Sequence, residues 1–192
     1  MAPPTRRTAR PATFIALLRA VNVGGRNTLP MAELRALCAG LGWEGVQTYI
    51  QSGNVVFQSR TPQATLEQEL ERAIARRFDL TIPVIVRAAR DWSVMLAGNP
   101  FPEASRKEPN AVMVALCRRP PPDDAAAGVL ERAVNGERVR QVGDALWIHY
   151  ARGAAKSKLS PGLLDRLVGS PVTSRNWRTV LKLEELAGQV RG

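Results

Sequence analysis

The sequence predicts an α+β protein built from two tandem ferredoxin-like (split βαβ) sandwiches, each an antiparallel sheet covered by helices. Two observations predict this fold class. Strand and helix patterns occur in the same order in both halves of the 192 residues: strand, helix, strand, strand, helix, strand, helix. A proline-rich stretch of mixed charge, residues 99–110, separates the halves. Because each half is only about 90 residues long, we expect the two to share apolar surface rather than to move as separate domains.

The first half contains four expected strands and three expected helices. The apolar run from Phe14 to Leu18 has no polar alternation, which is typical of a central strand buried on both faces. Ser52-Gly53 predicts a tight hairpin. Proline favours the first position of a helix, so Pro30 and Pro62 mark helix starts. Strands are expected at 13–21, 46–51, 54–59 and 81–87, and helices at 30–42, 61–78 and 89–97.

The second half repeats this order less regularly. Gly143-Asp144 predicts a second hairpin, and Ser160-Pro161 is typical of a helix start. Strands are expected at 111–117, 137–142, 145–150 and 171–173, and helices at 120–134, 160–168 and 176–189. The expected organisation is a disordered basic tail at 1–11, a first subdomain at 12–98, a linker at 99–110 and a second subdomain at 111–192.

Positive charge is concentrated at the two ends of the chain. The formal net charge is +10; residues 151–192 contain eight Lys/Arg against three Asp/Glu, and residues 1–60 contain seven against two. A GC-rich genome would also favour arginine, but codon composition does not explain why the excess lies at the ends. If the fold brings the two ends together, they form one positive surface that attracts anionic partners.

The cysteine content and the hydropathy pattern indicate a cytoplasmic protein. Cys38 and Cys117 lie among apolar neighbours and are expected in the core, not in a disulfide framework. No apolar run is long enough to span a membrane, and the segment from Met1 to Pro11 lacks the apolar region of a secretory signal. We therefore expect no membrane partner.

Four stretches of the chain resemble the signatures of one known family. They are FIALLRAVNVGGRN from Phe14, MAELR from Met31, TYIQSGNVVF from Thr48 and SRNWRTV from Ser174. Together they resemble the bacterial domain-of-unknown-function 1697 family over nearly the whole chain after the tail. The resemblance implies a cytoplasmic bacterial protein with two tandem ferredoxin-like subdomains, in agreement with the order of elements. It implies no activity, because the family has no established function.

Common catalytic motifs are not found in the sequence. His149 is the single histidine. A His-rich metal site therefore cannot be built, and we expect a structural role for His149 rather than a place in a Ser/His pair. The stretch from Gly153 to Ser157 is superficially similar to a phosphate-binding P-loop, but Ala155 stands where that motif needs glycine. The sequence therefore predicts no catalytic residue, no metal and no cofactor, and it favours a non-catalytic protein over an enzyme.

Three segments are candidates for binding an anion. Backbone N–H groups at Gly24-Gly25 could form an anion nest, a Gly/Ala loop with two lysines follows a predicted strand, and residues 173–178 open the last predicted helix. Arginines in a first helical turn cost about 0.3–1 kcal/mol each unless an anion offsets them. Trp177 could stack on a base; the alternatives are solvated turns, an internal ion pair and a tryptophan in the core. The candidate ligand-binding residues are Arg19, Asn22, Gly24, Gly25, Arg26, Asn27, Lys156, Lys158, Arg175, Asn176, Trp177 and Arg178.

These observations favour a binding module for a phosphate-bearing ligand, either nucleic acid or a nucleotide-like metabolite. One alternative is a small enzyme acting on a phosphorylated or carboxylate metabolite, which would need a concave pocket with a titratable group of shifted pKa. A second alternative is an interaction protein whose basic face binds an acidic partner. All three require the basic segments to converge, and the oligomeric state is left open.

Overall fold

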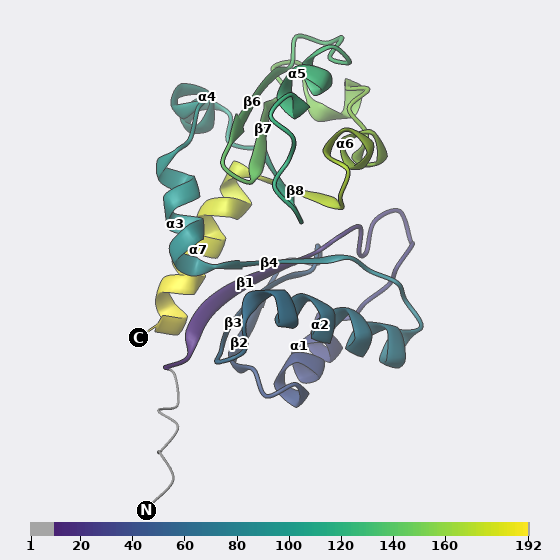
Figure 1. Cartoon of the computed structure of the whole chain (residues 1–192), viewed down its shortest axis with the longest axis vertical. Helices are drawn as coiled ribbons and strands as arrows, with labels where there is room; N and C mark the ends of the chain where they lie inside the picture. Colours follow the sequence, from purple (N-terminus) through teal and green to yellow (C-terminus); the bar gives the residue numbers. More distant parts are fainter. Residues whose placement is uncertain (1–9, 192) are drawn as a thin grey trace, which may run out of the picture.

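The structure is a computed structural model that describes residues 10–191 (Figure 1). Residues 1–9 of the expected basic tail lie outside the described residues. The first half comprises β1 (Ala12–Leu18), α1 (Met31–Gly40), β2 (Glu44–Tyr49), β3 (Asn54–Ser59), α2 (Gln63–Phe78), β4 (Val84–Ala88), α3 (Ala89–Ala97) and α4 (Pro102–Lys107). The second half comprises β5 (Val112–Cys117), α5 (Ala125–Leu130), β6 (Arg138–Val142), β7 (Ala145–His149), the 3-10 turn η1 (Ala154–Lys156), α6 (Pro161–Val168), β8 (Val172–Asn176) and α7 (Trp177–Arg191).

The strand order confirms the predicted fold class. The first sheet has the order β2-β3-β1-β4 and the second has β6-β7-β5-β8, and all neighbouring strands within each sheet are antiparallel. In both sheets the first strand of the half is central, flanked by the third and fourth. The protein is therefore a tandem pair of ferredoxin-like sandwiches.

The two sheets also match in register. Arg87 of β4 lies opposite Ile15, and Arg175 of β8 lies opposite Val114, at the same step of the ladder between the fourth and first strands. A helix begins two residues after each arginine, α3 in the first half and α7 in the second. This correspondence fits an internal duplication of one ferredoxin-like unit.

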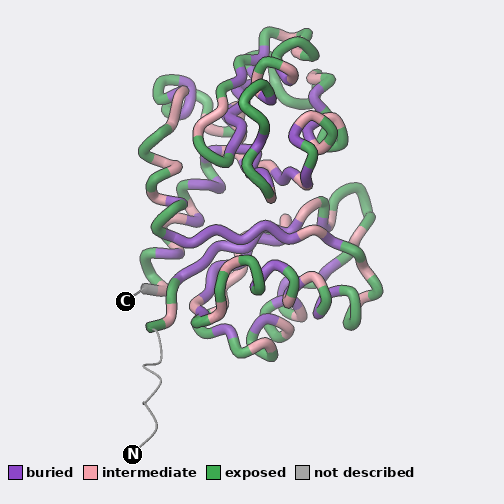
Figure 2. The backbone as a smooth tube through the Cα atoms, in the orientation of Figure 1, coloured by how far each residue is buried: buried purple, intermediate pink, exposed green. Residues whose placement is uncertain are grey.

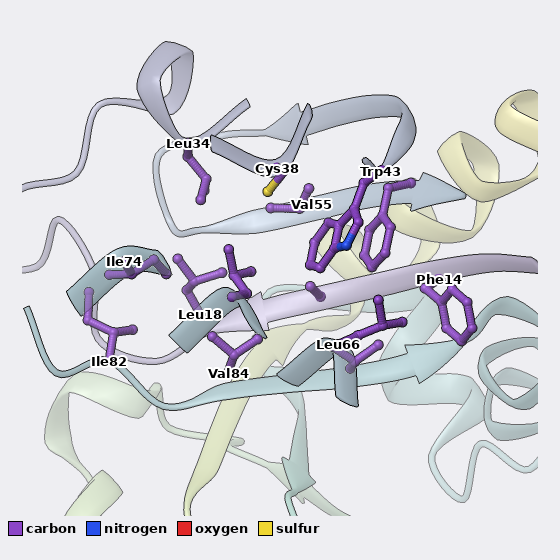
Figure 3. Packing of buried hydrophobic residues seen from close by; sticks show 14 of the residues in the cluster. Phe14, Leu18, Leu34, Cys38, Trp43, Val55, Leu66, Ile74, Ile82 and Val84 are labelled. Atoms are coloured by element: carbon purple, nitrogen blue, oxygen red, sulfur yellow. The ribbon is translucent and has the colours of Figure 1, made fainter. Parts of the chain in front are cut away.

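The outer face of the first sheet packs against α1 and α2. Phe14 and Leu18 of β1 point to this face, where Figure 3 shows them in one cluster with Leu34 and Trp43. The indole of Trp43 stacks on the Phe57 ring with centroids 3.7 Å apart. Burying a large apolar side chain stabilises the fold by about 1.5–3 kcal/mol, so this cluster holds the two helices on the sheet.

The inner faces of the two sheets share a second apolar cluster. Ile15 and Leu17, which alternate with the outward residues of β1, pack in one cluster with Val114 and Trp147 of the second sheet. Helices α3 and α7 lie side by side at one edge of this cluster (Figure 1). Figure 2 shows the central strands of both sheets as buried. Burial on both faces explains why these strands lack polar alternation, and it confirms the expected shared apolar surface.

A third cluster covers the other face of the second sheet. There α5 and α6 pack on Leu146 and Ile148 of β7, with Cys117 of β5 beneath them. Both cysteines are free and fully buried, as expected from their apolar neighbours. Within the described range, no helix is long and apolar enough to cross a bilayer.

Several predicted boundaries differ from the structure. Helix α5 is only Ala125–Leu130, not 120–134, and Gly128 within it lowers its helix propensity. The stretch 99–110 contains the short helix α4, in which Ala104 is buried. Strand β8 extends to Asn176, so the expectation that Arg175 lies at the start of the last helix is wrong. The single arginine in this strand is explained by its buried hydrogen bonds, described below.

Candidate anion-binding cavity

A cavity of about 420 Å³ opens where the two subdomains meet. The first subdomain lines it with the segment after β1 and the β2–β3 turn, and the second with β8, α6 and the first turn of α7. No acidic side chain, histidine or cysteine is among the described residues that line it. The residues used below are Arg19, Val23, Ile50, Ser52, Thr173, Ser174, Arg175, Asn176 and Thr179.

Arg175 is buried beside this cavity and is 8% exposed. An arginine side chain has five N–H donors, and all five are used here. The acceptors are Asn54 Oδ1 at 2.5 Å, Thr173 Oγ1 at 2.9 Å, Ser174 O at 2.9 Å, Leu18 O at 2.9 Å and Ser52 O at 2.8 Å. Three of these acceptors belong to the first subdomain, so the guanidinium joins the two subdomains.

None of the acceptors of Arg175 is a carboxylate. Burial lowers the pKa of its guanidinium to about 10, because desolvation disfavours the charged form. The side chain is still protonated at neutral pH. A charge that only neutral oxygens surround keeps a positive potential around it, and low local dielectric strengthens that potential. This charge therefore favours an anion over a cation in the adjoining cavity.

Arg19 lies directly after β1 and also lines the cavity. Its Nη2 pairs with Asp165 Oδ2 at 2.7 Å, and its Nε donates to Val172 O at 3.1 Å. Asp165 Oδ1 in turn accepts from Val172 N at 2.9 Å. Arg19 is thus paired with a carboxylate, whereas Arg175 donates only to neutral oxygens.

The predicted glycine turn borders the cavity through Val23. Gly24 and Gly25 have φ values of +58° and +73°, which glycine adopts at no steric cost. The Arg26 N–H donates to Val23 O at 3.1 Å and closes the turn. Arg26 itself is exposed. The turn is therefore a fixed feature at the rim, and Arg26 is a cation that a ligand could reach.

Asn22 and Asn27 hold the glycine turn in place. Asn22 accepts from Leu29 N at 2.8 Å and donates to Leu29 O at 2.9 Å and Gln51 O at 2.8 Å. Asn27 donates to Ala20 O at 3.0 Å. The sequence left open whether these amides bind a ligand or cap turns, and their hydrogen bonds are those of turn capping.

Four predicted residues near the end of the chain lie in different surroundings. Asn176 lines the cavity and caps α7, accepting from Thr179 N at 2.9 Å. Trp177 packs inside the shared core, 5.5 Å from the ring of Trp147, where no base can stack on it. Arg178 is exposed outside the cavity lining. The cation next to the cavity at this end is therefore Arg175 and not Arg178.

The two predicted lysines lie on a separate surface. Lys156 and Lys158 are exposed in the segment that contains η1. The Lys156 carbonyl accepts a hydrogen bond from Asn135, which ties this segment to the loop before β6. Neither lysine lines the cavity. Of the twelve predicted ligand-binding residues, the structure brings Arg19, Arg175 and Asn176 to one cavity, with the glycine turn at its rim.

His149 is buried at the edge of the shared core. Its Nδ1 accepts from Arg138 Nε at 3.2 Å, and its Nε2 lies 3.2 Å from Glu108 Oε1. The Phe101 ring covers it, with centroids 6.1 Å apart. These contacts fit the structural role expected for His149, which lies away from the cavity lining.

Sequence reasoning did not identify Ile50 or Thr179 as lining residues, and it included Thr173 in a candidate segment without naming it as a ligand-binding residue. Ile50 is 50% exposed and adopts a φ of +47°, both unusual for isoleucine. The isoleucine at position 50 gave no signal in the sequence that it would be exposed at the rim of a cavity.

The protein is thus a two-subdomain ferredoxin-like protein whose sheets pack against each other, with a cavity lined by two arginines between the subdomains. A family model described as protein of unknown function (DUF1697) matches residues 12–147, and the chain belongs to this family. This confirms the family that the sequence motifs indicated.

The chain is also similar to a solved structure. A conserved bacterial protein from Streptococcus pneumoniae matches it with a TM-score of 0.72 and 24% sequence identity, and the match covers 93% of this chain and 99% of that protein. At this identity the likeness establishes the fold alone. No curated protein matches the sequence significantly.

Proposed function

We propose that the protein binds a small phosphate-bearing metabolite in the cavity between its subdomains. The observation that carries this proposal is Arg175, a buried cation that donates only to neutral oxygens beside a cavity without acidic lining in the described part of the chain. A bound anion would offset the unfavourable burial of this charge. Arg19 adds a second guanidinium, and hydroxyl groups of Ser52 and Thr179 are available in the same walls.

The rim of the cavity favours a ligand that is more than a bare anion. Val23 is 62% exposed and Ile50 is 50% exposed, and both line the cavity. Apolar walls with a few placed polar groups are typical of small-molecule sites. A nucleotide-like metabolite, with a phosphate near Arg175 and an apolar or aromatic part between Val23 and Ile50, fits this combination.

The nucleic-acid alternative is less well supported. Proteins of this fold class that bind RNA use aromatic residues on an exposed sheet face. Here Phe57, Trp147 and Tyr150 are buried, because both sheets are covered on both faces. Binding rather than catalysis is proposed because the cavity lining in the described range offers no carboxylate, imidazole or thiol to act as acid or base.

A thermal-shift screen tests the proposal, because a ligand that binds only the folded state raises the melting temperature. The panel contains inorganic phosphate, pyrophosphate and nucleoside monophosphates, with sodium chloride at matched ionic strength as the control. Saturation at about 100 times Kd stabilises the fold by about 2.7 kcal/mol, which corresponds to roughly 5–10 °C for a chain of this size.

Two variants of Ile50 provide a matched pair. Asparagine and aspartate both tolerate the positive φ at this position, and the side chain is half exposed, so neither substitution should unfold the protein. Ile50→Asp places a negative charge at the rim and should abolish the shift, whereas Ile50→Asn should retain it. Equal responses of the two variants, or no response of the wild type to any phosphate in the panel, would contradict the proposal.

A further inference from the structure

A second cavity, of about 390 Å³, lies at the related position on the other side of the interface. It opens between β4 and α3 of the first subdomain and the β6–β7 hairpin of the second. Arg87 lines it and holds in β4 the register position that Arg175 holds in β8. The chemistry of its walls is different, because aspartates line this cavity, whereas no aspartate is among the described residues that line the first.

Arg87 is 9% exposed and has hydrogen-bonding capacity to spare. Its guanidinium donates to the carbonyls of Val86, at 2.8 Å, and of Cys117. Among the described residues, these are the acceptors of its five N–H groups, so three donors remain without a protein acceptor. The nearby Glu67 does not take them, because its carboxylate accepts from Val86 N and faces Arg118.

Two aspartates line the same cavity without pairing with Arg87. Asp91 is exposed and its closest cation is Arg90, with Nε 3.3 Å from Oδ1. Asp144 is exposed in the β6–β7 turn, and no cation of the described chain lies within 4 Å of its carboxylate. One buried guanidinium and two carboxylates therefore line a single cavity without direct ion pairs between them.

Apart from Gln63, the remaining lining side chains are apolar. Trp92 and Leu116 are almost fully buried, and Met95 and Val142 are also among the lining residues. Apolar walls with a few convergent polar groups and a volume of about 300–1,000 Å³ are typical of small-ligand sites. The indole Nε1 of Trp92 donates to Val180 O at 3.2 Å, which fixes this wall against α7.

We infer that this second cavity binds a small zwitterion with an apolar side chain, such as a free amino acid. The carboxylate of the ligand accepts from the spare N–H groups of Arg87, in the bidentate geometry that guanidinium favours. Its ammonium group lies toward Asp91 and Asp144, and its side chain packs against Trp92 and Leu116. A doubly charged phosphate is disfavoured here, because the aspartates repel it.

Calorimetric titration of the full chain tests this inference. L-leucine and L-phenylalanine are each compared with the analogue that lacks the amino group, isocaproate or hydrocinnamate, and with the analogue that lacks the carboxylate, isoamylamine or phenethylamine. At least one amino acid should bind, and both of its analogues should bind at least about tenfold more weakly, since each loses one charged contact of about 1.4 kcal/mol.

Variants of the exposed aspartates localise the site. The double substitution Asp91→Asn with Asp144→Asn should weaken amino-acid binding about tenfold or more, while Asp123→Asn, in an exposed turn away from the cavity, should not change it. Binding of neither amino acid at millimolar concentration, or equal binding of an amino acid and its deaminated analogue, would overturn the inference. Because the probes and variants differ from those for the phosphate site, failure at one cavity leaves the other test intact.

Discussion

Arg87 and Arg175 make reciprocal contacts across the interface of the two subdomains. Arg87 donates to the carbonyl of Cys117, the last residue of β5, and Arg175 donates to the carbonyl of Leu18, the last residue of β1. The donors hold equivalent positions in β4 and β8, and the acceptors end equivalent strands. Each subdomain thus contributes one buried arginine that donates a hydrogen bond to the carbonyl of the last residue of a central strand in the other subdomain.

Next to these hydrogen bonds, two ion pairs also join the subdomains in a reciprocal way. Arg19 directly follows Leu18 and pairs with Asp165 at 2.7 Å; Arg118 directly follows Cys117 and pairs with Glu71 at 2.7 Å. The difference between the two sides is Glu67, a second carboxylate 3.4 Å from Arg118. On the side of Arg87, two carboxylates accompany the two arginines, and Asp91 and Asp144 also line the cavity, whereas on the side of Arg175 the two arginines have the single carboxylate of Asp165. This asymmetry underlies the two different ligand classes proposed for the two cavities.

The two buried arginines should differ in their effect on stability. Arg175→Lys leaves several acceptors of the five without a donor and should lower the free energy of unfolding by about 2–4 kcal/mol. Arg87→Lys affects two carbonyl acceptors and should cost about 1 kcal/mol. Urea unfolding of both variants measures the difference. A loss for Arg87→Lys that equals or exceeds that for Arg175→Lys contradicts the hydrogen-bond count.

The Arg19–Asp165 pair should contribute modestly. Its side chains are 23% and 29% exposed, so solvent screens the attraction, and a coupling of about 0.5–1 kcal/mol is expected. A double-mutant cycle of Arg19→Gln and Asp165→Asn isolates this coupling, since asparagine can still accept from Val172 N. The coupling should decrease in high salt. If it is zero at low salt, the pair does not help to join the subdomains.

Gly53 should be far less tolerant of substitution than Gly24. Both have positive φ, +72° and +58°, so alanine is strained at either position. A Cβ at Gly53 would also lie 2.6 Å from the Val21 side chain and 2.7 Å from that of Leu18, whereas a Cβ at Gly24 meets no atom within 4 Å. We expect Gly24→Ala to cost about 1 kcal/mol and Gly53→Ala about 3 kcal/mol or more, as measured by thermal unfolding. Similar losses for the two variants would argue against a close approach at the β2–β3 turn.

The buried thiols should make stability fall at alkaline pH. Burial raises the pKa of Cys38 to about 12 and that of Cys117 to about 11, while thiols in the unfolded chain ionise near their ordinary value. Because both pKa values are raised by folding, the stabilisation is complete below about pH 8.5 and is lost as the pH rises toward the folded values. Between pH 8 and 10.5 each thiol should reduce the free energy of unfolding by roughly 2 kcal/mol.

Urea unfolding across this pH range measures the thiol effect. Cys38→Ala and Cys117→Ala variants are the controls, because each should flatten the pH dependence by the contribution of one thiol. Variants with the same pH dependence as the wild type would show that the thiols already ionise in the folded protein.

Apolar runs, hairpin turns and prolines were sufficient to predict the fold. The Ser52-Gly53 turn between its two flanking strands, and the prolines before α1 and α2, specify local structure through short-range sterics. The structure of the last part of the chain was harder to predict, because β8 carries Thr, Ser, Arg and Asn in place of an apolar pattern. Its strand conformation depends on pairing with β5, which no local signal predicts.

The candidate site could be predicted only in part. Charge counting directed attention to the segments that contain Arg19 and Arg175, but it did not predict that Arg175 donates all its N–H groups within the protein. Trp177 illustrates the limit of local interpretation, since an aromatic residue between arginines is equally suited to a surface and to a core. Which of the two holds depends on α7 packing across the first sheet, a contact between segments over 100 residues apart.

The most direct measurement of the central claim is a residue-resolved NMR titration of the wild-type chain with inorganic pyrophosphate. If the uncompensated charge of Arg175 defines the anion site, amide shifts should cluster at Val23, Ser52 and Thr173–Asn176 and saturate with one ligand per chain. Shifts confined to the exposed lysines of the η1 segment, or to the Arg87 cavity, would contradict the account.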